Sequence, residues 1–206
     1  MAKRADGTEE AERLKDERFE LLFDLRRSAR YHSARRGFFT RWSKLGSFIS
    51  VLAGGSTIAS ILAEADPWIS ISAAAVISIA QAAELVFDLS GKAMRHEGFY
   101  RDFVALEQRV ELQGDDIDRA QLRELISDRL RLESGEPPIL RWLDVLCYNE
   151  LAGSMGFSGS LKRVSWLQRQ LAHLLDMTPV HQGHAPAKPA KSLPGSPPAE
   201  SVTAAT

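Results

Sequence analysis

The sequence predicts an all-α integral membrane protein, in which a two-helix hairpin joins an antiparallel cytoplasmic helical stalk and further C-terminal helices. Three observations predict this class. Two long segments carry almost no ionisable side chain, the charged segments around them have helical apolar periodicity, and basic residues gather on one side of the uncharged pair. The chain has 206 residues and a formal net charge of −1, so no overall positive field attracts nucleic acid.

The uncharged segments define two predicted membrane spans, 45–63 and 67–87. The first reads LGSFISVLAGGSTIASILA, and the second begins PWISISAAAVISIAQAA before it reaches Glu84. The nineteen residues of the first span extend about 28 Å as a helix, close to the roughly 30 Å hydrocarbon core of a bilayer. Residues 64–66 suit a tight turn, and Pro67 suits the first position of the second helix.

The alternative is a hairpin buried in a soluble helical bundle, because both segments are rich in Ser, Ala and Gly. Such a hairpin needs apolar partners on all sides, whereas the other predicted helices have one apolar side each. For the membrane form, basic residues precede the first span and follow the second, while the turn carries only Glu64 and Asp66. The positive-inside rule therefore predicts a multi-pass protein of the cytoplasmic (inner) membrane with both termini cytoplasmic. Trp42 and Trp68 fall near opposite interfaces, where indole rings are favoured.

Small residues recur at every fourth position in both spans. They are Gly46, Ser50 and Gly54 in the first span and Ser70, Ala74, Ser78 and Ala82 in the second. Such stripes let helix backbones approach closely in lipid, so we expect one stripe to close the hairpin and the other to form contacts in a homo-oligomer. The alternative is that an Ala- and Ser-rich composition produces the spacing without any contact.

Gln81, Glu84 and Asp88 share one face at the cytoplasmic end of the second span. Rings of carboxylates favour cations in channels, so this face is a candidate pore mouth in an oligomer. The alternative is structural, because Glu84 and Asp88 lie at the interface, where Lys44 or Arg41 can pair with them.

The chain outside the spans is predicted to be helical within a domain of residues 8–177, after a flexible N-terminus of residues 1–7. A charge-rich helix over 8–43 and a continuation of the second span to Leu112 form the antiparallel stalk. Equal rises from the membrane place Tyr31 near Tyr100 and Leu25 near Leu106. Further helices are expected at about 117–133, 139–152 and 161–176, and the Pro-, Ala- and Ser-rich residues 178–206 are expected to be disordered.

Polar and aromatic residues of the stalk are the candidates for a special role. They are Tyr31, His32, Arg35, His96, Phe99 and Tyr100. The alternative is that they pack two helices together. We find no motif for an enzyme, a metal site or a cofactor. Ser90-Gly91-Lys92, for example, lacks the glycine spacing of a phosphate loop. Cys147 suits a core position. The expected packing residues of the last helices are Trp142, Leu146, Trp166 and Leu171.

Three helical segments carry a family resemblance. ARYHSARRGFFTRW precedes the first span, HEGFYRDFVALEQRV follows the second, and RWLDVLCYNELA lies further on. Over roughly residues 15–176 the chain resembles the SLATT family, the SMODS and SLOG-associating two-transmembrane effector domains of bacterial conflict systems. The resemblance implies an antiviral-defence effector that oligomerises in the lipid bilayer and forms a pore or permeabilises the cytoplasmic membrane. It also implies a nucleotide-signalling partner protein, and it carries over no catalytic residues. The alternative function is a non-permeabilising membrane scaffold whose cytoplasmic helices recruit a partner.

Overall fold

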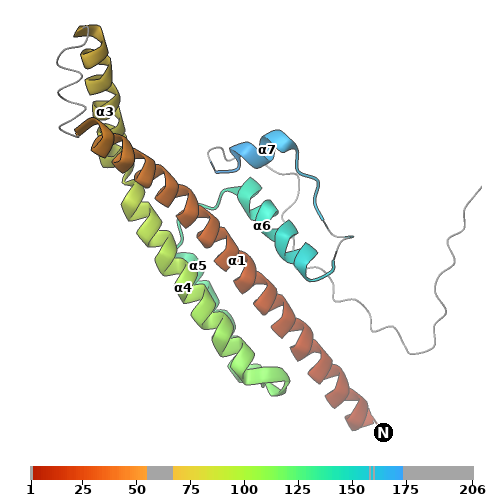
Figure 1. Ribbon diagram of the computed structural model, residues 1–206. Coiled ribbons are helices and arrows are strands. Elements are labelled where there is room, and N and C mark those ends of the chain that lie inside the picture. The colour runs from red at the N-terminus through yellow and green to blue at the C-terminus, as the bar shows by residue number, and fades with distance from the viewer. Residues whose placement is uncertain (1, 55–66, 158, 160, 174–206) are drawn as a thin grey trace, which may run out of the picture.

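A computed structural model describes residues 2–54, 67–157, 159 and 161–173. These residues form helices, turns and loops without a strand among them, which confirms the all-α class. The elements are α1 (Ala2–Gly54), α3 (Pro67–Phe87), α4 (Leu89–Gln113), the 3-10 turn η1 (Gly114–Asp116), α5 (Arg119–Ser134), α6 (Arg141–Ser154) and α7 (Trp166–Leu171). In Figure 1, α1 and α4 form a long antiparallel pair, and α3 lies beside the far end of α1.

Helix α1 runs unbroken from the charged segment into the first predicted span, because no proline occurs before Pro67. It begins at Ala2, inside the segment 1–7 that we expected to be flexible, since Ala, Lys and Arg there are strong helix formers. Only residues 45–54 of the first predicted span are described. The turn at 64–66 and the tail at 178–206 lie outside the described residues.

The expected continuous helix from the second span to Leu112 is wrong, because it is interrupted at Asp88 between α3 and α4. Asp88 has the left-handed φ of 46°, and its carboxylate accepts a hydrogen bond of 3.2 Å from the backbone N–H of Gly91. Asp tolerates this conformation better than most residues, since its short side chain can bond to nearby backbone amides. Helices α3 and α4 therefore meet at an angle in Figure 1.

The main hydrophobic core lies between α1, α4 and α5. Its buried residues include Leu21, Leu22, Leu25 and Ala29 of α1, Phe103, Leu106 and Val110 of α4, and Leu122 and Leu125 of α5. Asp118 caps α5 through a capping box with Gln121, which fixes the start of this helix against the pair. Leu25 and Leu106 belong to this one cluster. Tyr100 packs against the same cluster, whereas Tyr31 belongs to a second cluster with Trp142.

A second apolar side of α1, which the sequence analysis missed, packs against α6. Phe23 is fully buried, and its ring centroid lies 5.4 Å from that of Tyr148 in an edge-to-face arrangement. Phe19 lies one turn earlier on α1 and contacts Phe157 beyond the end of α6. The four-residue spacing of Phe19 and Phe23 is the signal that predicts this second side. Helix α1 is therefore central, with α4 and α5 on one side and α6 on the other.

Helix α7 is shorter than the predicted helix over about 161–176, of which residues 174–176 lie outside the described part. The side chain of Asn149 bonds to both the N–H (2.8 Å) and the carbonyl (2.7 Å) of Lys162, which holds that backbone outside a helix. Ser165 and Gln168 then form a capping box that starts α7. Trp142 is buried, and Leu146 and Leu171 pack beside it. The expected packing of Trp166 is wrong, because this side chain is exposed.

Candidate functional site

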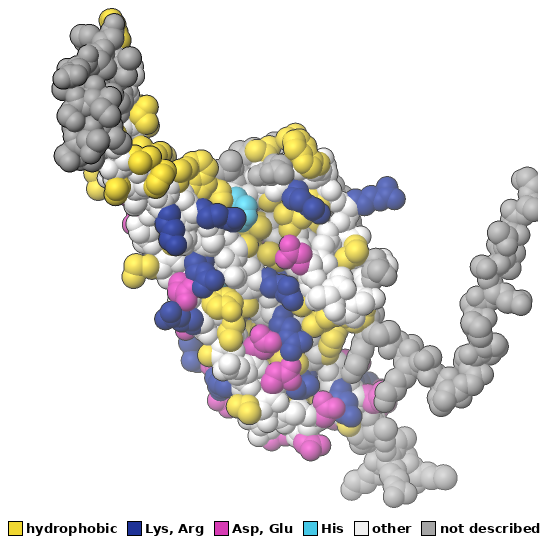
Figure 2. Space-filling model, viewed as in Figure 1, with side chains coloured by type: hydrophobic (Ala, Val, Ile, Leu, Met, Phe, Trp, Pro, Cys, Tyr) yellow, Lys and Arg dark blue, Asp and Glu magenta, His cyan; other side chains and the backbone are white. Residues whose placement is uncertain are grey.

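The far end of the molecule exposes large apolar side chains. One helical stretch among the described residues, Ala74–Asp116, is long and apolar enough to cross a membrane, and no residue of its apolar window is buried. Figure 2 shows hydrophobic atoms gathered at this end, whereas charged atoms cover the α1–α4 pair. The exposed residues are Leu45, Phe48, Val51, Leu52, Val76, Ile79, Leu85, Val86 and Phe87. Leaving such side chains in water forgoes about 1.5–3 kcal/mol each, so this end needs an apolar environment.

Ser50, in the small-residue stripe of α1, contacts α3. Ser50 donates a hydrogen bond of 2.9 Å to the carbonyl of Gly46, and its hydroxyl accepts one from the side-chain amide of Gln81 on α3. A Cβ added to Gly46 meets no atom within 4 Å. Gly54 is the last residue of α1. The described contact of this stripe with another helix is therefore made inside one chain, between Ser50 and Gln81.

The small residues of α3 lie on its exposed surface. Ala74, Ser78 and Ala82 are all exposed, and the hydroxyl of Ser78 donates a hydrogen bond of 2.9 Å to the carbonyl of Ala74. This self-contained hydrogen bond satisfies the hydroxyl without a partner helix. Ser70 belongs to α3, but its side chain lies outside the described atoms. A face of small side chains on α3 is therefore exposed, without a partner among the described residues.

Glu84 and Asp88 have local partners. The Oε1 atom of Glu84 accepts hydrogen bonds from the N–H of Ser90 (3.1 Å), from the hydroxyl of Ser90 and from the hydroxyl of Ser43 (3.4 Å). Asp88 caps α4. These contacts replace the ion pairs that we considered with Lys44 or Arg41. Because Gln81 bonds to Ser50, the three residues of the predicted polar face are engaged within the chain.

The most enclosed polar group joins α1 to α4. His32 and His96 are both buried, and their Nδ1 atoms lie 2.8 Å apart. Two ring nitrogens at this distance share one hydrogen, so one ring donates and the other accepts. Aromatic rings enclose the pair, because Phe99 stacks on His32 with centroids 5.0 Å apart and Phe39 stacks on His96 at 5.7 Å. Burial, the neighbouring His32 and the positive charges of Arg35 and Arg95 lower the pKa of His96 to about 4.

A carboxylate extends this histidine pair. Glu136, from the loop between α5 and α6, places its Oε1 atom 3.4 Å from the Nε2 atom of His32, and only 5% of its side chain is exposed. These two atoms are buried and have no hydrogen-bond partner within the described part of the chain, so the contact between them is electrostatic. Glu136 was not predicted as a site residue, because nothing in the turn Ser-Gly-Glu-Pro-Pro indicates which helix it faces. The row Glu136–His32–His96 therefore brings together polar side chains from the loop between α5 and α6, from α1 and from α4.

Tyr31 and Arg35 connect the same part of α1 to the rest of the fold. The Tyr31 hydroxyl accepts a hydrogen bond of 2.9 Å from the backbone N–H of Leu140, and burial raises the pKa of this tyrosine. Arg35 donates a hydrogen bond of 2.7 Å to the carbonyl of His173, after α7, and its guanidinium lies 4.4 Å from the ring centroid of Phe39. Burial lowers the pKa of Arg35. One segment of α1 therefore contacts the loop before α6 and the segment after α7.

Ion pairs border the buried pair of histidines. Arg36 bonds to Glu97, and this hydrogen bond lowers the pKa of the Glu97 carboxyl. The Arg36 guanidinium also lies 5.3 Å from the ring centroid of Tyr100. Further along the pair, Arg26 bonds to Glu107 (2.7 Å). These contacts fix the register of α1 and α4 on the solvent side of the core.

The comparisons with known proteins add no relative. No family model, no curated protein and no solved structure matches this chain. Within the described ranges, no three His, Cys, Asp or Glu side chains are grouped so that they can hold a metal ion. Two features of the molecule bear on its function: the apolar end, and the contacts that hold α1, α4 and the loop at Glu136 together.

Proposed function

We propose that this chain is a two-pass membrane protein that assembles in the cytoplasmic membrane and permeabilises it. The observation that carries the proposal is the exposure of the large apolar side chains on residues 45–52 and on α3. Their exposure in the single chain argues against a hairpin buried among the described helices of the same chain. Lipid tails can cover such a surface without leaving backbone N–H and C=O groups unpaired, because both segments are helical.

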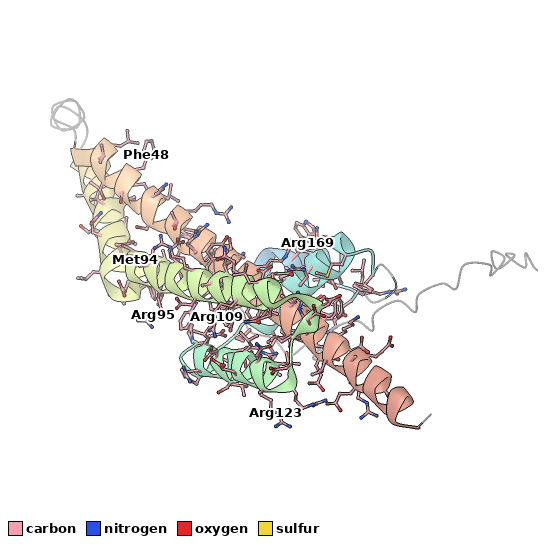
Figure 3. All side chains as sticks on the ribbon, turned by 90° about the horizontal axis from the view of Figure 1, so that it is seen from below. Phe48, Met94, Arg95, Arg109, Arg123 and Arg169 are labelled. Atoms are coloured by element: carbon pink, nitrogen blue, oxygen red, sulfur yellow. The ribbon has the colours of Figure 1, made fainter. Side chains whose placement is uncertain are left out.

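The orientation is supported by the charges next to the apolar end. On α1, the apolar residues that start at Leu45 are preceded by Arg41 and Lys44. On α4, Lys92 and Arg95 come soon after the end of α3. Figure 3 labels Phe48 on the hairpin and Met94 and Arg95 near the start of α4. Basic residues near the ends of membrane helices favour the cytoplasmic side, so both termini are proposed to be cytoplasmic.

Assembly is supported by the exposed face of Ala74, Ser78 and Ala82 on α3. Helices associate in lipid where small residues let their backbones approach closely, and this face has no described partner in the single chain. The remaining part of the proposal, a conflict-system effector controlled by a nucleotide-signalling component, is supported by the resemblance to the SLATT family. A buried contact such as His32–His96 offers a place where a cytoplasmic signal can change the packing of α1 on α4.

Membrane insertion is tested by alkaline extraction of membranes that contain the full-length chain. A hairpin with its apolar side chains in lipid resists extraction, because removal exposes them to water. We expect the chain to stay in the pellet and to need detergent for solubility. A full-length chain that is monodisperse without detergent contradicts the proposal.

Permeabilisation is tested in cells with a potential-sensitive dye. We expect induction of the native chain to collapse the membrane potential, and the variant Ser78→Leu to prevent the collapse, because a bulky side chain on the small face separates neighbouring helices. Val76→Leu is the matched control, since Val76 is exposed on the opposite side of α3 and its replacement should leave the collapse unchanged. An inserted native chain that leaves the potential intact rejects permeabilisation and supports the scaffold instead.

A further inference from the structure

The segment around α7 presents an apolar surface to solvent. Leu161 is 46% exposed, Trp166 is 73% exposed and Leu167 is 56% exposed. On the other side of the same segment, Leu171 and the fully buried Ala172 pack against the cluster of Trp142. Figure 2 shows hydrophobic atoms gathered over α7, apart from those of the hairpin. The helix is therefore two-sided, with one apolar side held in the fold and one left uncovered.

The charges of this segment have one sign. Residues 151–173 contain Lys162, Arg163 and Arg169 and no Asp or Glu. Arg163 and Arg169 are exposed, and Figure 3 labels Arg169 beside α6 and α7. Apolar side chains with a tryptophan and flanking cations are the composition that binds the interface of an anionic bilayer. A protein partner with an apolar groove does not by itself explain the absence of acidic residues.

The fold holds this segment at the level where the hairpin begins. The ring of His173 stacks on that of Phe38, with centroids 4.8 Å apart and planes 4° apart, and Arg35 bonds to the carbonyl of His173. Phe38 precedes Trp42 by one helical turn, with ring centroids 6.2 Å apart. In Figure 1, α7 lies at about the height at which α3 meets α4. The apolar surface of α7 and the base of the hairpin are thus at a similar depth.

We propose that α7 lies on the anionic surface of the membrane that the hairpin crosses, with Trp166 and Leu167 in the headgroup region. This inference rests on the proposed function, because a hairpin that does not insert brings no bilayer to α7. Tryptophan is favoured at that depth, and Arg163 and Arg169 attract anionic headgroups. The contact gives the chain a second attachment beside the hairpin, so the α1–α4 pair stands at a fixed inclination to the membrane.

The test places one fluorescent reporter in the full-length chain in vesicles of phosphatidylglycerol and phosphatidylcholine. A Leu167→Cys variant is labelled with an environment-sensitive dye, and lipids with a nitroxide near the headgroup act as quenchers. The native Cys147 does not compete, because it is buried and its pKa is raised to about 12 by that burial. Leu112→Cys is the matched control, since Leu112 is 86% exposed near the end of α4 that is remote from the hairpin. Val51→Cys, at a position 74% exposed on the hairpin, reports insertion.

We expect the label at position 167 to be quenched about threefold more than the label at position 112, as for an interfacial helix. Replacing phosphatidylglycerol by phosphatidylcholine, or introducing Arg163→Glu with Arg169→Glu, should reduce this quenching. A label at position 167 that stays unquenched while the label at position 51 is quenched overturns the inference and leaves the proposed function standing. A blue-shifted label at position 167 that lipid nitroxides do not quench indicates contact with a second copy and overturns the inference as well. Absence of quenching at both positions rejects the proposed function itself.

Discussion

The Nδ1 atoms of His32 and His96 lie 2.8 Å apart in a buried layer between α1 and α4. This distance requires one shared hydrogen, because two N–H groups pointing at each other repel. The other ring nitrogen of His32, Nε2, faces Glu136 at 3.4 Å. The positive charges of Arg35 on α1 and Arg95 on α4 both disfavour a further positive charge on His96. The contact between the two long helices is therefore coupled to protonation.

Acidification is expected to destabilise the folded chain. The pKa of His96 is lowered from its ordinary value of 6.5 to about 4, so between these values the unfolded chain binds more protons than the folded one. Above pH 6.5 the neutral ring of His96 makes its full contribution to the free energy of unfolding. This contribution falls by at most about 3 kcal/mol as the pH is lowered toward 4. Thermal unfolding of the full-length chain in micelles, followed by circular dichroism at several pH values, measures this loss.

The controls for this prediction are two histidine substitutions. His96→Gln removes the titrating ring and should flatten part of the decline between pH 6.5 and pH 4. His173→Gln should remove another part, because burial and the charges of Arg35 and Arg41 lower its pKa to about 4 as well. A decline of unchanged size in the double variant rules out this account of the pH dependence.

Gly91→Ala is expected to loosen the junction between α3 and α4. A Cβ at Gly91 collides with the carboxylate of Asp88, so the side chain must leave the backbone N–H that it caps. Loss of such a cap costs about 1 kcal/mol. Thermal unfolding should show this cost in the native background and little further cost in an Asp88→Ala background, where the collision and the cap are already absent. Equal costs in the two backgrounds count against the Asp88–Gly91 contact as their origin.

The ion pair of Arg26 with Glu107 is expected to contribute modestly to the α1–α4 contact. Its atoms lie 2.7 Å apart, and both side chains are partly exposed, so solvent screens their attraction. A double-mutant cycle with Arg26→Ala and Glu107→Ala should give a coupling of about 0.5–1 kcal/mol that falls as salt is added. Glu124→Ala with Arg26→Ala is the uncoupled control, because Glu124 pairs with Arg109. A coupling that does not respond to salt contradicts a screened ion pair.

Cys147 is expected to be unreactive in the folded chain. It is buried in the cluster of Trp142, and burial raises the pKa of its thiol to about 12. Alkylation needs the thiolate, so iodoacetamide near pH 8 should react on the order of a hundredfold more slowly with the folded chain than after denaturation. Mass spectrometry of the alkylated chain measures both rates. Rapid alkylation without denaturant shows that the α6 cluster opens.

Some features of this fold are readable because they depend on residues close in sequence. The absence of proline before Pro67 predicts a long helix, and α1 is unbroken from Ala2 to Gly54. The apolar pattern of Leu21, Leu25, Leu106 and Val110 predicts core positions, and all four are buried in one cluster. Periodicity is a local property, so it indicates which side of a helix is apolar.

Other features depend on contacts between distant residues. Phe23 was not among the predicted core residues, yet α6 buries it, and Trp166 was expected to pack in the core, yet it is exposed. Glu136 meets His32 only because the loop between α5 and α6 returns to α1. The sequence around Asp88 did not indicate the break between α3 and α4. At this position the cap that the Asp88 side chain makes on α4 competes with continuation of the α3 helix.

The amino-acid sequence by itself determined the helical class and the two uncharged segments, because hydropathy and helix propensity belong to neighbouring residues. Only the tertiary structure decided that the histidines of α1 and α4 share a hydrogen, that Glu136 joins them, and that α7 turns its tryptophan outward. These outcomes depend on how the helices lie against one another, and side-chain packing between segments about sixty to a hundred residues apart has no local signature.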